Sequence, residues 1–211
     1  MRQQERQERS RRMILQAAME EFGTQNYDSV SMERICSGHG ISKGMMYHYY
    51  ASREVLFLAC VSEVFRDLHR FLQEHWGKIQ ALPVFEAVQG YFLLREQFFE
   101  GRPWEKHIFE NAMFYPPAHL AEQIWELRTP IREGNDRFMR EILSHMTLRA
   151  GVNAEQAARY LNSVYTVFWP FLEQYQAHIK DLHAMLKGSE ELLDMALFGI
   201  AERRAEERKD V

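Results

Sequence analysis

The chain of 211 residues is poor in cysteine, proline and glycine, with 2 Cys, 6 Pro and 11 Gly. Two cysteines are too few for a disulfide scaffold, and Cys36 and Cys60 both lie in apolar helical patterns, so we expect small buried thiols. No segment shows the strict alternation of apolar and polar residues that marks a half-buried strand. The sequence therefore predicts an all-α fold.

Long apolar runs are also missing. None approaches the ~20 residues that are needed to span a bilayer. The charged first twelve residues are not followed by the apolar segment of a signal peptide. With 46% apolar and 27% charged residues, the composition is that of an ordinary soluble protein. We therefore expect a cytoplasmic protein without a membrane partner.

Motifs for catalysis are absent as well. There is no nucleophile elbow, phosphate-binding loop or dinucleotide motif. The pairs His107-x-x-Glu110 and His178-x-x-x-x-His183 lack the other ligands of a known metal site, and the paired Glu-x-x-His of di-iron bundles does not occur. We predict no enzyme, no cofactor and no metal; an all-helical enzyme stays open as an alternative.

Charge is distributed unevenly along the chain. The formal net charge is -4, which by itself argues against nucleic acid. Residues 1–53, however, carry eight Lys and Arg against six acids, a net charge of +2, so the remaining residues carry -6. A mildly basic end on an acidic body suits a protein that presents one end to phosphates.

Residues 31–57 contain the most informative pattern. Apolar residues at i, i+3 and i+4 indicate a short helix over 32–38, with Ser31 as a plausible N-cap. Gly38 and Gly40 then break the helix, and Ser42 is in position to cap a second short helix. Two short helices joined by a tight turn form a helix-turn-helix, whose second helix can enter the DNA major groove.

Further helices follow from apolar periodicity and from the Gly and Pro residues that separate the segments. Gly23 is expected to end the first helix. Ser52 is expected to cap the long fourth helix, and the stretch from Gly77 to Pro83 is expected to end it. Pro170 predicts a bend. Helices are expected over residues 7–22, 32–38, 42–49, 52–76, 84–99, 104–114, 118–128, 131–149, 154–177 and 189–205.

Three features stand together over about residues 10–60: a first helix that ends in Glu21-Phe22-Gly23, then Ser31-x-x-x-Ile35, and then GISKGMMYHYYASREVLF over residues 40–57. In this combination, the chain resembles the TetR family of bacterial transcriptional repressors. It implies an all-α homodimer with two DNA-binding heads and a ligand-responsive body. We divide the chain accordingly into a DNA-binding domain at 1–53 and a ligand-binding and dimerisation domain at 54–211.

Two positions depart from the family pattern. Met45 stands where the family has a small or hydroxylated residue, and Ala51 stands where lysine is common. Neither departure affects the expected fold. Both leave the operator sequence open.

The residue types of the head suggest how DNA is contacted. Ser31 and Ser42 start helices whose N-termini attract phosphate, although simple capping would also explain them. Lys43 opposes the dipole of its helix, and phosphate or guanine would offset that cost. Gly44 favours close backbone approach. The resemblance assigns Met46 to the core and Met45 to the groove, where Met45 could pack on a thymine methyl. The predicted DNA-binding residues are Ser31, Ser42, Lys43, Gly44, Met45, Tyr47, His48 and Arg53.

The body is rich in aromatic residues and methionine at helical spacing. Each such residue is more often core than ligand contact, but together they allow an apolar pocket with a few polar anchors. An acidic group against aromatic walls would suit a lipophilic cation. The candidate ligand-binding residues are Phe92, Glu96, Phe99, Trp104, His107, Glu110, Trp125, Arg128, Tyr165, Phe168 and Trp169.

The last two predicted helices, over residues 154–177 and 189–205, are apolar on more than one face. Such a helix needs burial on two sides, one of which a symmetry-related subunit can supply. This agrees with dimerisation through the last two long helices, which the resemblance implies. The candidate interface residues are Leu161, Phe168, Leu193, Leu197 and Ile200.

Taken together, these patterns predict a homodimeric repressor of a palindromic operator that is released when a small lipophilic or aromatic molecule binds the body. A helix-turn-helix regulator or adaptor that acts without a small ligand remains the main alternative. The identities of the ligand and the operator, and repression as against activation, stay open.

Overall fold

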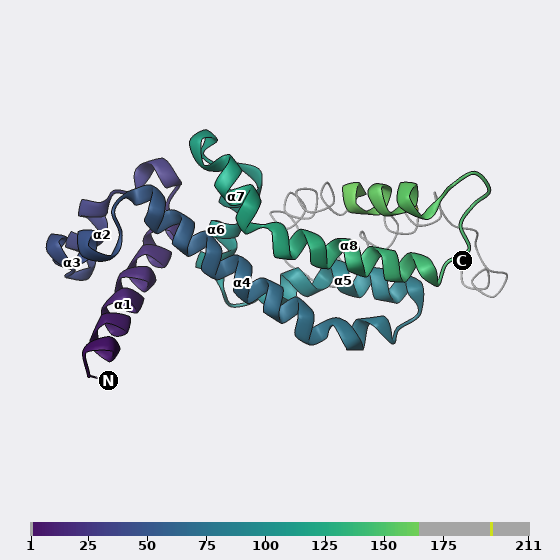
Figure 1. Cartoon of the computed structure of the whole chain (residues 1–211), viewed down its shortest axis with the longest axis horizontal. Coiled ribbons are helices and arrows are strands. Elements are labelled where there is room, and N and C mark those ends of the chain that lie inside the picture. Colours follow the sequence, from purple (N-terminus) through teal and green to yellow (C-terminus); the bar gives the residue numbers. More distant parts are fainter. Residues whose placement is uncertain (1, 165–194, 196–211) are drawn as a thin grey trace. The chain divides into compact units, whose positions relative to one another are not determined.

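A computed structural model describes residues 2–164 and 195 of the chain (Figure 1). The described part is helical, as predicted, and residues 154–164 form its last helix. None of the helices in this part is long and apolar enough to cross a membrane. The other elements are α1 (Arg2–Thr24), η1 (Tyr27–Ser29), α2 (Met32–His39), α3 (Lys43–Tyr49), α4 (Arg53–Gln80), α5 (Val84–Phe99), α6 (Pro103–Phe114), η2 (Ala118–Leu120), α7 (Ala121–Leu127) and α8 (Thr129–Ser144).

The chain forms two compact units. The first contains Met1–Phe71 and Glu96–Ile131, and the second contains Leu72–Arg95 and Arg132–Val211. Helices α4 and α5 each contribute to both units. The first unit thus joins the helix-turn-helix to α6 and α7, whereas the boundary at residues 53 and 54 stays a prediction from the sequence.

The head consists of α1, η1, α2, α3 and the first turns of α4, and it closes around aromatic rings. The ring of Phe22 stands edge-on to Phe57 at 5.0 Å between centroids, and Tyr27 lies 4.9 Å from Phe57. Met46 and Tyr50 are buried in the same unit. The short helix η1, which brings Tyr27 into this core, was not predicted from the sequence.

Several predicted boundaries were wrong. Helix α1 begins at Arg2, earlier than expected, and it continues through Gly23 to Thr24. Helix α4 likewise continues past Gly77 to Gln80, and α2 continues past Gly38 to His39. Helix α8 tolerates Pro130 because the residue lies in its first turn, where the missing N–H has no helical partner. The expected bend at Pro170 lies outside the described residues.

The described core of the second unit is aromatic. Tyr91 of α5 stacks on Phe138 of α8 at 3.8 Å between ring centroids, and Trp76 stands edge-on to Phe138 at 5.4 Å. The hydroxyl of Tyr91 donates a hydrogen bond to Oδ1 of the buried Asn135. This bond supplies a partner to two polar groups that would otherwise be costly to bury.

The two cysteines are free and buried, as expected from the sequence. Burial raises the pKa of the thiols of both Cys36 and Cys60 above the ordinary value. At neutral pH both are therefore protonated and behave as small apolar side chains.

Candidate DNA-binding site and its contacts

Serine caps define the helix-turn-helix. The Ser31 side chain accepts a hydrogen bond from the N–H of Arg34 at 3.1 Å, and the Ser42 side chain accepts one from the N–H of Met45 at 3.2 Å. Between the two helices, Gly40 adopts φ 64° and ψ 27°, a left-handed conformation that glycine takes without strain. Both predicted N-caps are thus confirmed, and a tight turn joins α2 to α3.

Helix α3 has one buried and one exposed side. Met46 is fully buried, Met45 is half-buried, and Tyr47 is 47% exposed. The remaining predicted contacts on this helix, Lys43, Gly44 and His48, are exposed. The predicted division, with Met46 in the core and Met45 toward the surface, is confirmed. The exposed side is one helical stripe of cationic, aromatic and small residues, which is suited to a DNA groove.

Arg53 stabilises the head itself. Its Nη1 donates a hydrogen bond to the carbonyl of Val30 at 3.2 Å, and its guanidinium lies 4.2 Å from the centre of the Tyr27 ring. These contacts hold the turn before α2 against the start of α4. The predicted phosphate contact of Arg53 stays a prediction, and only guanidinium donors that are not used within the head could make it.

The start of α4 is held by hydrogen bonds around Tyr27. The Ser52 side chain accepts from the N–H of Val55 at 3.4 Å, so Ser52 caps α4 as predicted. Hydrogen bonding from Ser52, and also from Tyr27, lowers the pKa of Glu54. Burial raises the pKa of Tyr27, whose hydroxyl donates to Glu54 at 3.3 Å and lies 3.4 Å from Nε2 of His119 in η2. The turn after α6 thus contacts the head.

An acidic residue connects α1 to α2. A carboxylate oxygen of Glu21 accepts a hydrogen bond from Nε of Arg34 at 2.7 Å, and the other lies 3.5 Å from Nε2 of His39. Glu21 is part of the family pattern, but its role in orienting α2 could not be deduced from spacing. The partners come from another helix, and helical periodicity within one segment does not show such pairs.

Gly23 lies where α1 packs against α6. A Cβ atom added to Gly23 would lie 2.3 Å from Cβ and 2.6 Å from Cα of Trp104. The glycine is therefore required by the close approach of two helices, and it does not end α1. Trp104, a predicted ligand contact, is placed by this geometry against the head.

Sequence comparison places this head and body in a known family. A model of the bacterial regulatory proteins of the tetR family matches residues 14–60, and a model of the tetracyclin repressor-like C-terminal domain matches residues 82–194. The chain belongs to the TetR family. It is thus a TetR-family transcriptional regulator, as the helix-turn-helix pattern indicated.

Relatives and solved structures agree with this assignment. The HTH-type transcriptional regulator UidR of Escherichia coli strain K12 is 26% identical over 153 residues, which cover 72% of this TetR-family chain and 76% of UidR. A TetR family regulator from Chloroflexus aurantiacus J-10-FL superposes with a TM-score of 0.64 at 22% identity, covering 93% and 95% of the two chains. The regulator FadR of Bacillus subtilis, solved in complex with stearoyl-CoA, superposes with a TM-score of 0.67 at 14% identity. The superposition covers 89% of this chain and 98% of FadR.

Two candidate ligand-binding residues of this TetR-family protein, Glu96 and Glu110, both lie close to Lys106. Lys106 was not among the residues predicted from the sequence. Lys106 Nζ lies 3.3 Å from Glu96 Oε2 and 3.8 Å from Glu110 Oε1. The three side chains are largely buried. The ammonium group of Lys106 therefore occupies the position beside these two acids at which the sequence suggested a bound lipophilic cation.

The other described candidates are less closely grouped. Phe99 is buried and its ring lies 5.0 Å from that of Phe109. Trp125 is 54% exposed, and the guanidinium of Arg128 lies 5.8 Å from the centre of its ring. Nε2 of His107 is buried without a hydrogen-bond partner among the described residues. Phe92 lies on α5, and Tyr165, Phe168 and Trp169 lie outside the described residues.

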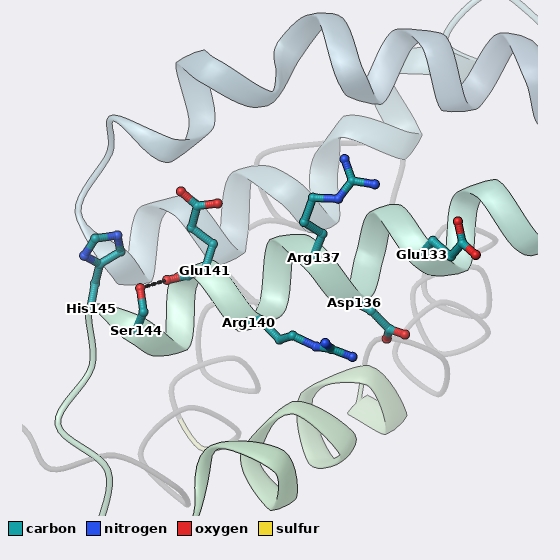
Figure 2. A pocket seen from close by; sticks show the side chains of 7 residues that line it. All are labelled: Glu133, Asp136, Arg137, Arg140, Glu141, Ser144 and His145. Atoms are coloured by element: carbon teal, nitrogen blue, oxygen red, sulfur yellow. Dashed lines mark hydrogen bonds between the residues drawn. The ribbon is translucent and has the colours of Figure 1, made fainter.

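Two hollows on the second unit are lined by other residues. One, of about 750 Å³, follows α8 and is shown in Figure 2; the other, of about 580 Å³, lies between α8 and the helix at 154–164. Asp136 and Arg140 line both and point toward that helix (Figure 2), where Asn162 donates to Asp136 at 2.7 Å. Charged side chains dominate the wall of the first hollow, whereas the second also has apolar walls from α8 and the helix at 154–164. Neither hollow contains any of the candidate ligand-binding residues, so neither is the aromatic pocket that the sequence predicted. The first hollow is lined by Glu133, Asp136, Arg137, Arg140, Glu141, Ser144 and His145.

Of the candidate interface residues, Leu161 is described, and it is 1% exposed. The single chain thus covers Leu161, and its predicted place in the interface stays a prediction. Tyr160 beside it is 39% exposed. Phe168, Leu193, Leu197 and Ile200 lie outside the described residues.

Proposed function

We propose that this TetR-family regulator is a repressor that binds a palindromic operator as a homodimer. In the proposed complex, helix α3 of each subunit enters the major groove. Two successive grooves on one face of the duplex require recognition helices ~34–36 Å apart. A repressor that binds chromosomal DNA must share its compartment, so we place it in the cytoplasm.

The observation that carries this proposal is Gly44. It lies in the first turns of α3, where glycine weakens a helix by roughly 0.5–1 kcal/mol relative to alanine. Its φ is not positive, and an added Cβ would meet no atom of the described chain within 4 Å. The fold therefore does not explain the glycine. A DNA backbone or base edge that closely approaches α3 would explain it.

Neighbouring side chains support the same interface. Ser42 caps the helix at the end where its partial positive charge attracts phosphate, and Lys43 adds a full charge there. Tyr47 and His48 present polar tips on the exposed side of the helix. We propose Lys43, Tyr47 and His48 as phosphate contacts and Met45 as an apolar contact to a thymine methyl.

We further propose that a small lipophilic or aromatic effector binds the body and releases the DNA. Packed rings at the end of α5 and on α6, together with the buried His107 nitrogen, supply apolar walls and a polar anchor. The FadR structure with stearoyl-CoA shows that one protein of this fold holds a lipophilic molecule. To move the regulator from 99:1 to 1:99 between two states, the effector must favour one state by ~5.5 kcal/mol.

The replacement of Lys43 with alanine tests the phosphate contact. We expect weaker binding to the operator and a smaller dependence on salt, with the slope of log K against log salt reduced by about one, because one fewer counterion is released. Fluorescence anisotropy over a range of salt concentrations measures both quantities. Lys78→Ala, which removes an exposed lysine of the second unit, is the matched control. An unchanged slope for Lys43→Ala would remove this residue from the phosphate contacts.

A further inference from the structure

An acidic residue of α2 lies beside the lysine that starts α3. Oε1 of Glu33 is 3.6 Å from Nζ of Lys43, and the two side chains are 60% and 67% exposed. The neighbouring Arg34 is bound to Glu21 instead. No family motif or helical period in the sequence pointed to Glu33, because its partner belongs to the next helix.

Helix dipoles explain why the pair is favourable without DNA. Glu33 lies in the first turn of α2, where a negative charge is stabilised, and Lys43 lies in the first turn of α3, where a positive charge is destabilised. The carboxylate of Glu33 compensates the unfavourable position of Lys43. In the free protein, Lys43 thus already has an anionic partner.

We propose that Glu33 limits the affinity of the head for DNA by competing with phosphate for Lys43. This inference rests on the proposed phosphate contact of Lys43. When DNA binds, the ammonium group exchanges a carboxylate for a phosphate, so the contact adds less affinity than a lysine without an anionic partner would. Glu33 also brings a negative charge close to the polyanion, a general repulsion that does not depend on Lys43.

A double-mutant cycle separates the pair from the general repulsion. Full-length wild type, Glu33→Gln, Lys43→Met and the double variant are compared in anisotropy titrations with a fluorescein-labelled 30-base-pair duplex of arbitrary sequence, since phosphate contacts do not require an operator. We expect Glu33→Gln to raise affinity, and to do so about 1.5- to 5-fold more strongly with Lys43 present than in the Lys43→Met background, the range for exposed ion pairs.

Controls distinguish the possible failures. Glu8→Gln removes a carboxylate that pairs with Arg12 on α1, and its effect should be the same in both backgrounds. Thermal unfolding of each variant checks that the fold is retained. Equal effects of Glu33→Gln in both backgrounds would overturn the competition while leaving the lysine contact intact. If Lys43→Met itself changes neither affinity nor salt slope, the proposed phosphate contact fails and the inference fails with it.

Discussion

Replacing Gly23 with alanine is expected to destabilise the protein by about 1–3 kcal/mol, the usual cost of forcing an extra methyl group into a closely packed contact. The new Cβ would lie 2.3 Å from Cβ and 2.6 Å from Cα of Trp104. Real Cβ atoms do not approach other carbon atoms so closely. Because the Trp104 backbone forms part of the contact, rotation of the tryptophan side chain cannot relieve it, and α1 and α6 must separate.

The expected loss for Gly23→Ala is measured as the free energy of unfolding in urea. Gly44→Ala is the matched control, since it makes the same chemical change in a helix where the added Cβ meets nothing within 4 Å. Adding Trp104→Ala to the Gly23 variant should not restore stability, because Cα and Cβ of residue 104 remain. If Gly23→Ala is as stable as the wild type, or if Trp104→Ala fully restores its stability, α1 and α6 do not approach each other as closely as described.

Replacing Gly44 with alanine should have opposite effects on the fold and on DNA binding. We expect the free energy of unfolding to rise by roughly 0.5–1 kcal/mol, because alanine favours a helix over glycine and meets no neighbour. Operator affinity should fall about 5- to 150-fold, since a displaced α3 loses the equivalent of one base contact of about 1–3 kcal/mol. Unfolding in urea and anisotropy titrations measure the two effects on the same preparations.

A bulkier residue sharpens this test. Gly44→Leu also favours the helix, but it extends further from α3, so its affinity for the operator should fall below that of Gly44→Ala. The buried neighbour Met46 is unsuitable for this test. Its substitution by a smaller residue would leave a cavity in the head, so a loss of stability could not be separated from a loss of operator affinity. If both Gly44 variants bind the operator as tightly as wild type, DNA does not approach this part of α3.

Local features of the helix-turn-helix could be predicted from the sequence, since each depends on neighbours within four residues. The caps at Ser31, Ser42 and Ser52 follow from this short-range chemistry, as does the turn at Gly40. The burial of Met46 follows from helical spacing combined with the family resemblance. The predictions of these features were correct because no distant part of the chain is needed to form them.

Contacts between distant segments could not be predicted in the same way. Gly23 was expected to end a helix, a common role for glycine, but its neighbour Trp104 is more than eighty residues further along the chain. The lysine between Glu96 and Glu110 escaped notice for a similar reason, since its partnership with Glu96 requires α5 and α6 to be packed together. The effector site depends on many such contacts, which periodicity within one helix does not reveal.

The most direct test of the proposed interface is a hydroxyl-radical footprint of the full-length protein on genomic DNA fragments. Two copies of α3 in successive major grooves predict two protected segments, related as an inverted repeat, with centres 10–10.5 base pairs or a multiple of this distance apart. The Gly44→Leu variant should protect neither segment at the same concentration. Protein that is folded by circular dichroism but protects no inverted repeat would contradict the account.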